Sequence, residues 1–133
     1  MKRADRTAVA LAGLLGTAAV LHGVRPEPFD TIVPRNLPGT PRFWTYASGV
    51  AEGGVAAALA VPRTRRLGGW AAVALFTAVF PANVSMALAW NRKEPVYRAI
   101  GWGRLPLQIP LILWSLRVAR AGNTTPPDNP RRK

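Results

Sequence analysis

The sequence predicts an all-α protein, a four-helix transmembrane bundle, and three observations support this prediction. First, 49% of the 133 residues are hydrophobic, yet the mean hydropathy is only +0.08, because apolar residues and charges occupy separate parts of the chain. Second, the apolar segments approach the ~20 residues that a helix needs to cross a bilayer. Third, a soluble domain of this size would spread its charges along amphipathic helices. We therefore expect one membrane domain, at residues 1–120.

The first three spans are expected at residues 7–24, 43–62 and 67–90. The first and third contain no charged residue, and the second contains one, Glu52. Arg42 and Arg63 flank the second span. Segments of this length and composition are typical of helices that cross a membrane.

A fourth span is expected at residues 105–120, where two prolines interrupt the apolar pattern. Pro106 fits the first helical turn, in which a missing N–H costs nothing, whereas Pro110 is expected to kink the helix. After this span, residues 121–133 are rich in proline, asparagine and arginine, and they are expected to form a disordered basic tail.

The distribution of positive charge predicts the orientation. With four spans, eleven Lys and Arg residues lie on the side of both termini and seven on the other side. The positive-inside rule therefore places both termini in the cytoplasm of a multi-pass protein of the inner (plasma) membrane. A net charge of +12 is also found in nucleic-acid-binding proteins. Here the arginines flank apolar segments, which favours contact with the anionic headgroups of a lipid bilayer over a nucleic-acid partner.

The longest predicted loop, residues 25–42, contains five prolines and cannot be helical throughout. It also carries the apolar residues Phe29, Ile32, Val33 and Leu37. Two interpretations follow. The loop either folds back over the bundle as a lid or lies at the membrane interface.

The composition limits the chemistry of the chain. There is no cysteine, which excludes disulfides, thiolate-ligated iron–sulfur clusters and thiol redox chemistry within it. The single histidine, His22, cannot form a multi-ligand metal site alone. Any redox role would therefore need a partner or a bound organic cofactor.

The main candidate site residue is Glu52, near the middle of the second span. An ionisable group at that depth costs about 3 kcal/mol or more and is a functional candidate by default. On a helix, Ser48 shares its face, while Gly49 and Gly53 form a stripe of small residues that favours close helix packing. A purely structural interpretation, in which Glu52 only accepts hydrogen bonds from a neighbouring helix, remains open.

A buried carboxylate needs partners, and few polar residues are available. His22 ends the first span and Asn83 follows Pro81 in the third, while Arg104 and Gln108 share a face of the fourth helix because they are four residues apart. We expect no catalytic or metal-ligating residues. The predicted binding residues are Glu52, His22, Ser48, Asn83, Arg104 and Gln108.

The five tryptophans mostly fall near the predicted ends of spans, which is typical of an aromatic belt at the membrane interface and not of a cofactor site. No phosphate-binding loop, nucleophile elbow or pair of catalytic carboxylates is present. The tryptophans are Trp44, Trp70, Trp90, Trp102 and, deeper in its span, Trp114.

As a set, several short motifs between His22 and Trp114 resemble the DoxX-like family of small bacterial membrane proteins. The resemblance implies a four-helix membrane bundle. It also implies a link to quinone-dependent sulfur oxidoreductases or to membrane oxidative-stress complexes, in which some relatives are subunits or partners. The motifs are Pro28-Phe29, Ile32-Val33-Pro34, Leu37-Pro38, Ser48-Gly49-Val50-Ala51-Glu52, Pro62-Arg63, Phe80-Pro81-Ala82-Asn83 and Arg104-Leu105-Pro106-Leu107-Gln108.

Two functions and a structural role follow from these observations. The first is an accessory subunit of a membrane redox system that contacts a quinone and a membrane or soluble oxidoreductase, without being an enzyme on its own. The second is a small proton-coupled transporter that uses Glu52 and forms a homo-oligomer through the Gly49–Gly53 stripe. The third is a structural membrane protein without activity.

Overall fold

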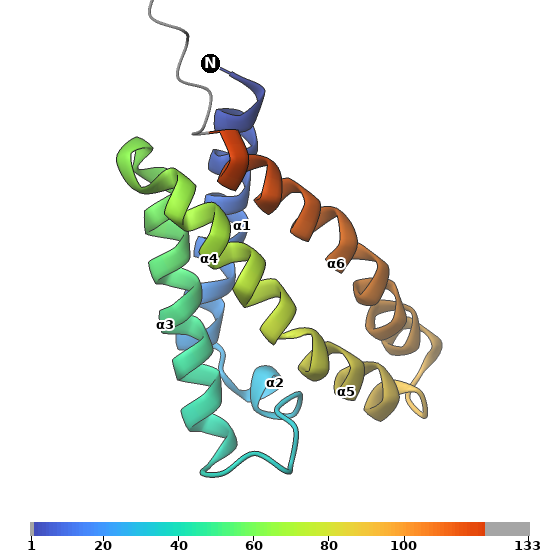
Figure 1. Ribbon diagram of the computed structural model, residues 1–133. Helices are drawn as coiled ribbons and strands as arrows, with labels where there is room; N and C mark the ends of the chain where they lie inside the picture. Colours follow the sequence, from blue (N-terminus) through green and yellow to red (C-terminus); the bar gives the residue numbers. More distant parts are fainter. Residues whose placement is uncertain (1, 122–133) are drawn as a thin grey trace, which may run out of the picture.

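The computed structural model describes residues 2–121, and this part of the chain is helical, with no β-strand. Helices α1 and α3 pack side by side, α4 and α5 follow one another, and α6 runs back along them (Figure 1). The elements are α1 (Arg3–Val24), α2 (Glu27–Asp30), α3 (Pro41–Ala60), the 3₁₀ turn η1 (Pro62–Thr64), α4 (Arg65–Ala78), α5 (Phe80–Trp90) and α6 (Pro95–Ala121).

Helices α1 and α3 overlap the predicted spans 7–24 and 43–62 but begin earlier. The start of α3 is set by local capping. The Thr40 side chain accepts a hydrogen bond from the backbone N–H of Phe43 at 3.3 Å, and Pro41 occupies the first turn. Each predicted span was started at the first residue of an uncharged segment. A helix can begin earlier, among charged residues on the polar side of a membrane, and α1 and α3 do so.

The predicted single span at 67–90 is divided in the structure, where α4 ends at Ala78 and α5 begins at Phe80. Pro81 explains the interruption, because it has no N–H to donate to the carbonyl one turn earlier and its ring crowds that turn. Together the segment from Pro62 to Trp90 is still 29 residues long and apolar enough to cross a membrane, as is the 22-residue α1.

The predicted span 105–120 lies within a longer helix, because α6 begins at Pro95. The predicted span starts only after Arg104, because Arg98 and Arg104 are charged. A charged residue does not end a helix, so α6 also includes residues 95–104. Pro106 and Pro110 both lie inside α6. The predicted tail, 121–133, lies outside the described residues except for Ala121, which is the last residue of α6.

The hydrophobic core lies at the end of the molecule where the N-terminus, η1 and the end of α6 meet (Figure 1). At the opposite end, α5 packs mainly against α6 and diverges from α3. The fold is therefore tightly packed at one end and separated at the other. The buried core residues are Ala8, Leu11, Leu15, Ala56, Leu59, Ala72, Phe76 and Val118.

The contact between α4 and α6 depends on Gly69. A Cβ atom at this position would lie 2.5 Å from the backbone nitrogen of Ala119 and 2.8 Å from its Cα. We therefore expect Gly69→Ala to destabilise the protein by about 1–3 kcal/mol, because backbone atoms of α6 would have to move. Thermal unfolding in detergent measures this effect.

Gly13→Ala is the matched control for this substitution. Gly13 is also helical, but no atom lies within 4 Å of the position that its Cβ would take. There the same change should be neutral or stabilising by up to ~1 kcal/mol, since alanine is the better helix former. Equal unfolding midpoints for the two variants would contradict the proposed α4–α6 contact.

Candidate functional site

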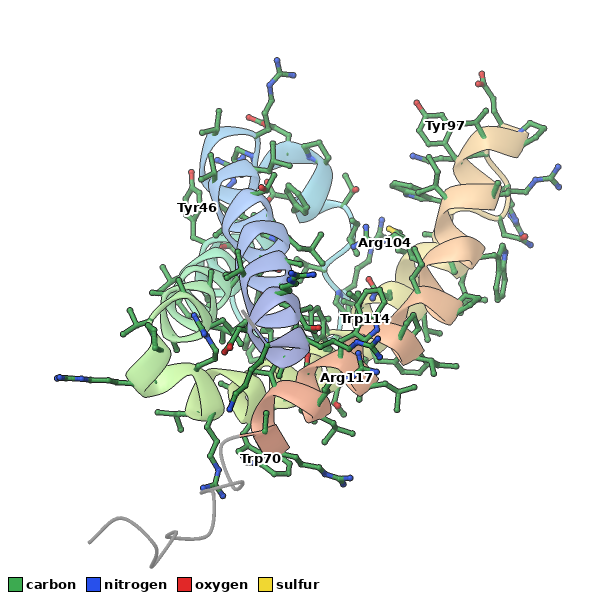
Figure 2. The ribbon with its side chains drawn as sticks, turned by 90° about the horizontal axis from the view of Figure 1, so that it is seen from above. Tyr46, Trp70, Tyr97, Arg104, Trp114 and Arg117 are labelled. Atoms are coloured by element: carbon green, nitrogen blue, oxygen red, sulfur yellow. The ribbon has the colours of Figure 1, made fainter. Side chains whose placement is uncertain are left out.

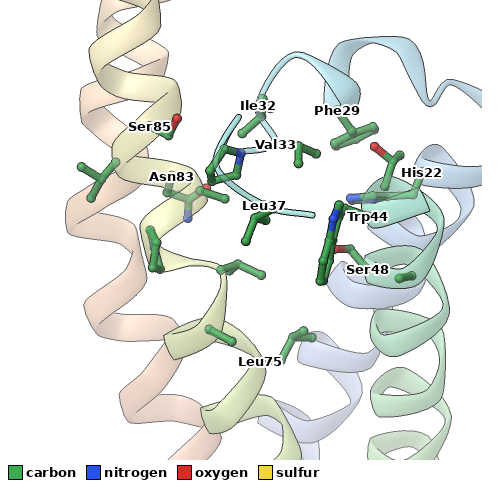
Figure 3. A pocket seen from close by; sticks show the side chains of 18 of the residues that line it. His22, Phe29, Ile32, Val33, Leu37, Trp44, Ser48, Leu75, Asn83 and Ser85 are labelled. Carbon is green, nitrogen blue, oxygen red and sulfur yellow. The ribbon is translucent and has the colours of Figure 1, made fainter. Parts of the chain in front are cut away.

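A cavity of about 860 Å³ lies where the helices diverge, and it opens to the outside of the protein. The end of α1, the segment 26–40, the first half of α3, the α4–α5 junction and one residue of α6 form its walls (Figure 3). Most of the lining side chains are apolar, so the few polar groups stand out as positions that would orient a ligand.

His22 and Glu52 form the polar part of the α1–α3 wall. Nδ1 of His22 lies 3.2 Å from Oε2 of Glu52, and both side chains are nearly buried. The same nitrogen lies 2.7 Å from the carbonyl oxygen of Ala18. Because a carbonyl can only accept, we assign a proton to Nδ1 and a hydrogen bond from it to Ala18. The imidazole also stacks on Phe29, with ring centroids 3.8 Å apart.

Gly49 allows this pair to form. A Cβ at position 49 would lie 2.9 Å from the Cβ of His22, so any larger residue would push α1 and α3 apart. A Cβ at position 53 would lie 3.7 Å from the Cβ of Ala19, which is an ordinary van der Waals contact, so Gly53 faces α1 without being required by the spacing. Of the stripe of small residues that the sequence showed, Gly49 is therefore the member that sets the distance between the two helices that carry His22 and Glu52.

The opposite wall carries Asn83 and Arg104. The guanidinium of Arg104 lies 3.7 Å from the sulfur of Met86 (Figure 2 shows the position of Arg104 on α6), and its positive charge acts on Glu52 across the cavity. Nδ2 of Asn83 donates a 2.8 Å hydrogen bond to Oε1 of Gln108. Arginine and amide groups on this wall thus face the imidazole and carboxylate of the other.

Gln108 does not line the cavity. It is buried behind Asn83, and its Nε2 donates to the backbone carbonyl of Phe76, at the end of α4. The prediction that Gln108 belongs to the binding residues is therefore not supported by its position, because its amide groups are used to join α6 to the α4–α5 junction. The other predicted residues, Glu52, His22, Ser48, Asn83 and Arg104, all line the cavity.

Trp44 lines the cavity as well, although its place near the end of a span indicated an aromatic belt. Its indole Nε1 donates a 2.6 Å hydrogen bond to the carbonyl of Pro38, which fixes the ring at the cavity wall (Figure 3). In the sequence, only the proline-rich loop before α3 could have indicated that Trp44 contacts the loop and does not lie at the membrane interface.

The segment 26–40 covers the cavity, which agrees with the lid interpretation of the loop. Its apolar residues Phe29, Ile32, Val33 and Leu37 line the cavity from α2 onward (Figure 3). Phe29, Ile32 and Val33 are partly buried and Leu37 is 38% exposed, and together these side chains give the cavity an apolar roof.

Asp30 fastens this lid to α3. One carboxylate oxygen accepts a 2.6 Å hydrogen bond from the Thr45 hydroxyl, and the other accepts a 2.9 Å bond from Nε of Arg42. The Thr45 hydrogen bond, together with the Arg42 hydrogen bond and charge, lowers the pKa of Asp30 below its ordinary value, although partial desolvation opposes this. The ionised form is therefore the one that holds the lid.

Acid should weaken this attachment. A carboxyl whose pKa is lower in the folded state adds stability above its unfolded pKa of about 3.9, and this stability is lost as the pH falls through the lower folded value. We expect the stability difference between the wild type and Asp30→Asn to shrink between about pH 6 and about pH 3. Thermal midpoints across this range measure it, and a constant difference would contradict a role for the ionised carboxylate.

Comparison with known proteins identifies the family. Residues 11–119 match the model of a domain of unknown function, DUF8561. No curated protein and no solved structure matches the chain. The matched range includes all the cavity residues described above and most of every long helix. The chain therefore belongs to the DUF8561 family.

Proposed function

We propose that the chain is a multi-pass protein of the inner membrane, with α1, α3, α4 together with α5, and α6 as its four spans. Two of these segments meet the length and composition of a membrane span. The N-terminus and the end of α6 lie at the same end of the molecule, as an even number of crossings requires (Figure 1). Among residues 2–121, eight of the fifteen Lys and Arg residues belong to that end, which favours cytoplasmic termini.

The surface supports this location. Every long helix exposes large apolar side chains, which a bilayer would cover and water would not. They include Val9 and Leu14 of α1, Phe43 and Val50 of α3, Leu67 and Trp70 of α4, Phe80 and Leu88 of α5, and Leu107, Ile109 and Leu113 of α6.

We propose further that the cavity binds a quinone-class molecule. The observation that carries this proposal is the combination of an 860 Å³, mostly apolar cavity with an imidazole–carboxylate pair in its wall. A quinoid ring fits apolar walls and the flat faces of Trp44 and Phe29, while its oxygens need hydrogen-bonding groups. Oxidation of a quinol also needs proton acceptors, which His22 and Glu52 would supply.

Side chains of this kind transfer protons but do not store electrons. The electrons of a quinone reaction would pass to or from a partner, so we propose that the protein is an accessory subunit of a membrane redox system with an oxidoreductase as its partner. The resemblance to DoxX-like proteins belongs to the same proposal, and because this chain has no cysteine, the proposed role includes no thiol chemistry.

Fluorescence of Trp44 tests quinone binding, because Trp44 is the tryptophan in the cavity wall. A short-chain benzoquinone added to purified protein in mild detergent should quench the wild-type emission with saturation. The saturable part should disappear in Trp44→Phe, while the other tryptophans keep only weak collisional quenching. Quenching that is linear in quinone concentration, and equal in both proteins, would contradict the proposal.

A proton-coupled transporter is the second candidate, because Glu52 lies in the wall of an open cavity where both a proton and a substrate would reach it. In that case, addition of the substrate should release protons from the purified protein, and Glu52→Gln should abolish the release. Absence of proton release over a broad panel of compounds would exclude this function.

A further inference from the structure

Arg104 brings a positive charge to the cavity wall, and no carboxylate pairs with it. Its side chain is exposed and lines the cavity from α6. Among residues 2–121 its guanidinium contacts the sulfur of Met86 at 3.7 Å and forms no ion pair. A thioether is a weak acceptor, so most of the guanidinium N–H donors stay available. An arginine inside a membrane span is costly and marks a functional position by default.

Glu52 does not neutralise this arginine. It lies on the opposite wall, where its Oε2 is buried and turned to Nδ1 of His22 at a distance of 3.2 Å. The other ion pairs within residues 2–121 involve no residue of the cavity wall. The guanidinium of Arg104 is therefore open to an anion that comes from outside the protein.

Two hydroxyl groups in the cavity wall are also without a partner. Ser48 on α3 and Ser85 on α5 lie on facing walls (Figure 3), and neither hydroxyl forms a hydrogen bond with another group of the described chain. A hydroxyl can donate, and a guanidinium can only donate. These open groups suit a ligand whose polar end is rich in acceptor oxygens.

The rest of the cavity wall suits a hydrocarbon chain. Most of its side chains are apolar, among them Ile32, Leu75 and Val79. A volume of about 860 Å³ is that of a site for one small molecule. A lipid with a single chain is therefore a better match than a phospholipid with two chains.

We propose that the cavity binds a long-chain carboxylate, the anion of a fatty acid, with its carboxylate on Arg104 and its chain along the apolar wall. The planar guanidinium can hold a carboxylate through two parallel hydrogen bonds. This ligand goes beyond the proposed function and does not depend on it. Because both ligands would occupy the same cavity, the fatty acid would compete with the quinone.

Three matched probes test the need for charge in the wild-type protein: a chain-brominated fatty acid, its methyl ester and the corresponding alcohol. Bromine quenches tryptophan on contact, so the quenching that is lost in Trp44→Phe reports occupancy of the cavity. At a pH that ionises the acid, and after correction for partition into detergent micelles, the acid should bind about ten-fold or more tightly than the ester and the alcohol. Both lack the charge-assisted hydrogen bonds to the guanidinium. Equal affinities, or no saturable binding of any probe, would overturn the inference.

Arg104→Gln provides the second arm. Its affinity for the acid should fall about ten-fold, while its affinity for the ester stays within about two-fold of the wild type. Partition of a probe into micelles is the same for both proteins and cancels in this ratio. Arg98→Gln is the matched control: Arg98 is exposed on the same helix and does not line the cavity, so binding of the acid should be unchanged. An Arg104→Gln variant that binds the acid as tightly as the wild type would overturn the role of Arg104.

Acetate separates a lipid site from a site for small anions. It carries the charged group without the chain, so at a matched concentration it should not displace the brominated acid. Displacement by acetate would overturn the assignment to a lipid. The comparison of the three probes does not depend on the folding of any Arg104 variant. Quinone binding has its own measurement, so failure of this inference leaves the proposed function standing.

Discussion

Replacing Ala51 with tryptophan is expected to reduce quinone binding by about a hundred-fold, or roughly 3 kcal/mol. Ala51 lines the cavity next to Glu52, and an indole group there would take up space that the ligand needs. Small-molecule sites bury most of the ligand surface, so partial filling removes contacts on several sides of the ring. Affinity for the quinone by equilibrium dialysis measures the effect without relying on tryptophan fluorescence.

The matched control is Ala57→Trp, the same change on the same helix. Ala57 is exposed and does not line the cavity, so its replacement should leave the affinity within about two-fold of the wild type. Both variants should keep the wild-type unfolding midpoint, because neither side chain enters the packed core. If Ala51→Trp binds the quinone as well as Ala57→Trp does, the ligand is not in this cavity.

Gln108→Leu is expected to have the largest effect on stability, a loss of about 2–4 kcal/mol. The substitution removes the acceptor for Asn83 and the donor to the carbonyl of Phe76. Asn83 and Phe76 are both buried, and both would lose these partners near the interruption between α4 and α5. Hydrogen bonds between membrane helices are often weaker, about 0.6 kcal/mol on average, but here two are lost together. Thermal unfolding in detergent is the measurement.

Ser115→Ala is a suitable comparison for this variant. Ser115 is fully buried on the same helix, but its hydroxyl donates only to the carbonyl of Leu111 in its own helix. Its loss should cost less than about 1 kcal/mol. Similar midpoints for Gln108→Leu and Ser115→Ala would show that the contact of Gln108 with the α4–α5 junction contributes little.

The sequence was sufficient to predict the helical class and the place of Glu52. Both depend on local information: long uncharged segments for the helices, and a lone carboxylate with small residues beside it for the site. The pairing with His22 was not predicted, because His22 was one of several candidate partners of Glu52 and the Gly49–Gly53 stripe was assigned to a homo-oligomer contact instead of to α1. The cavity gathers five of the six predicted residues.

The remaining features depend on packing between distant segments and were not predictable from local patterns. Gln108 was grouped with Arg104 by helical spacing, yet its partner is a backbone carbonyl exposed where α4 ends. Trp44 was assigned to the interface because its position near a span end is typical of a belt. Its contact with Pro38 depends on how the loop folds back, which no periodicity in the sequence encodes.

Asp30 is a third such case. In the sequence it is one acidic residue in a proline-rich loop, with no spacing that indicates a partner. In the structure it joins the loop to Thr45 and Arg42, which are 15 and 12 residues away. The lid over the cavity therefore depends on hydrogen bonds that appear only once the loop has turned back onto α3.

Photolabelling tests the central claim, that the cavity between α3 and α5 binds a quinone, most directly. A photoreactive azidoquinone would be cross-linked to the protein in lipid vesicles, and mass spectrometry would locate the label. We expect it on cavity residues such as Trp44, Leu75 and Ala82, with loss of labelling when unreactive quinone competes. Label confined to outward-facing residues such as Val9 and Leu113, unaffected by competition, would contradict the claim.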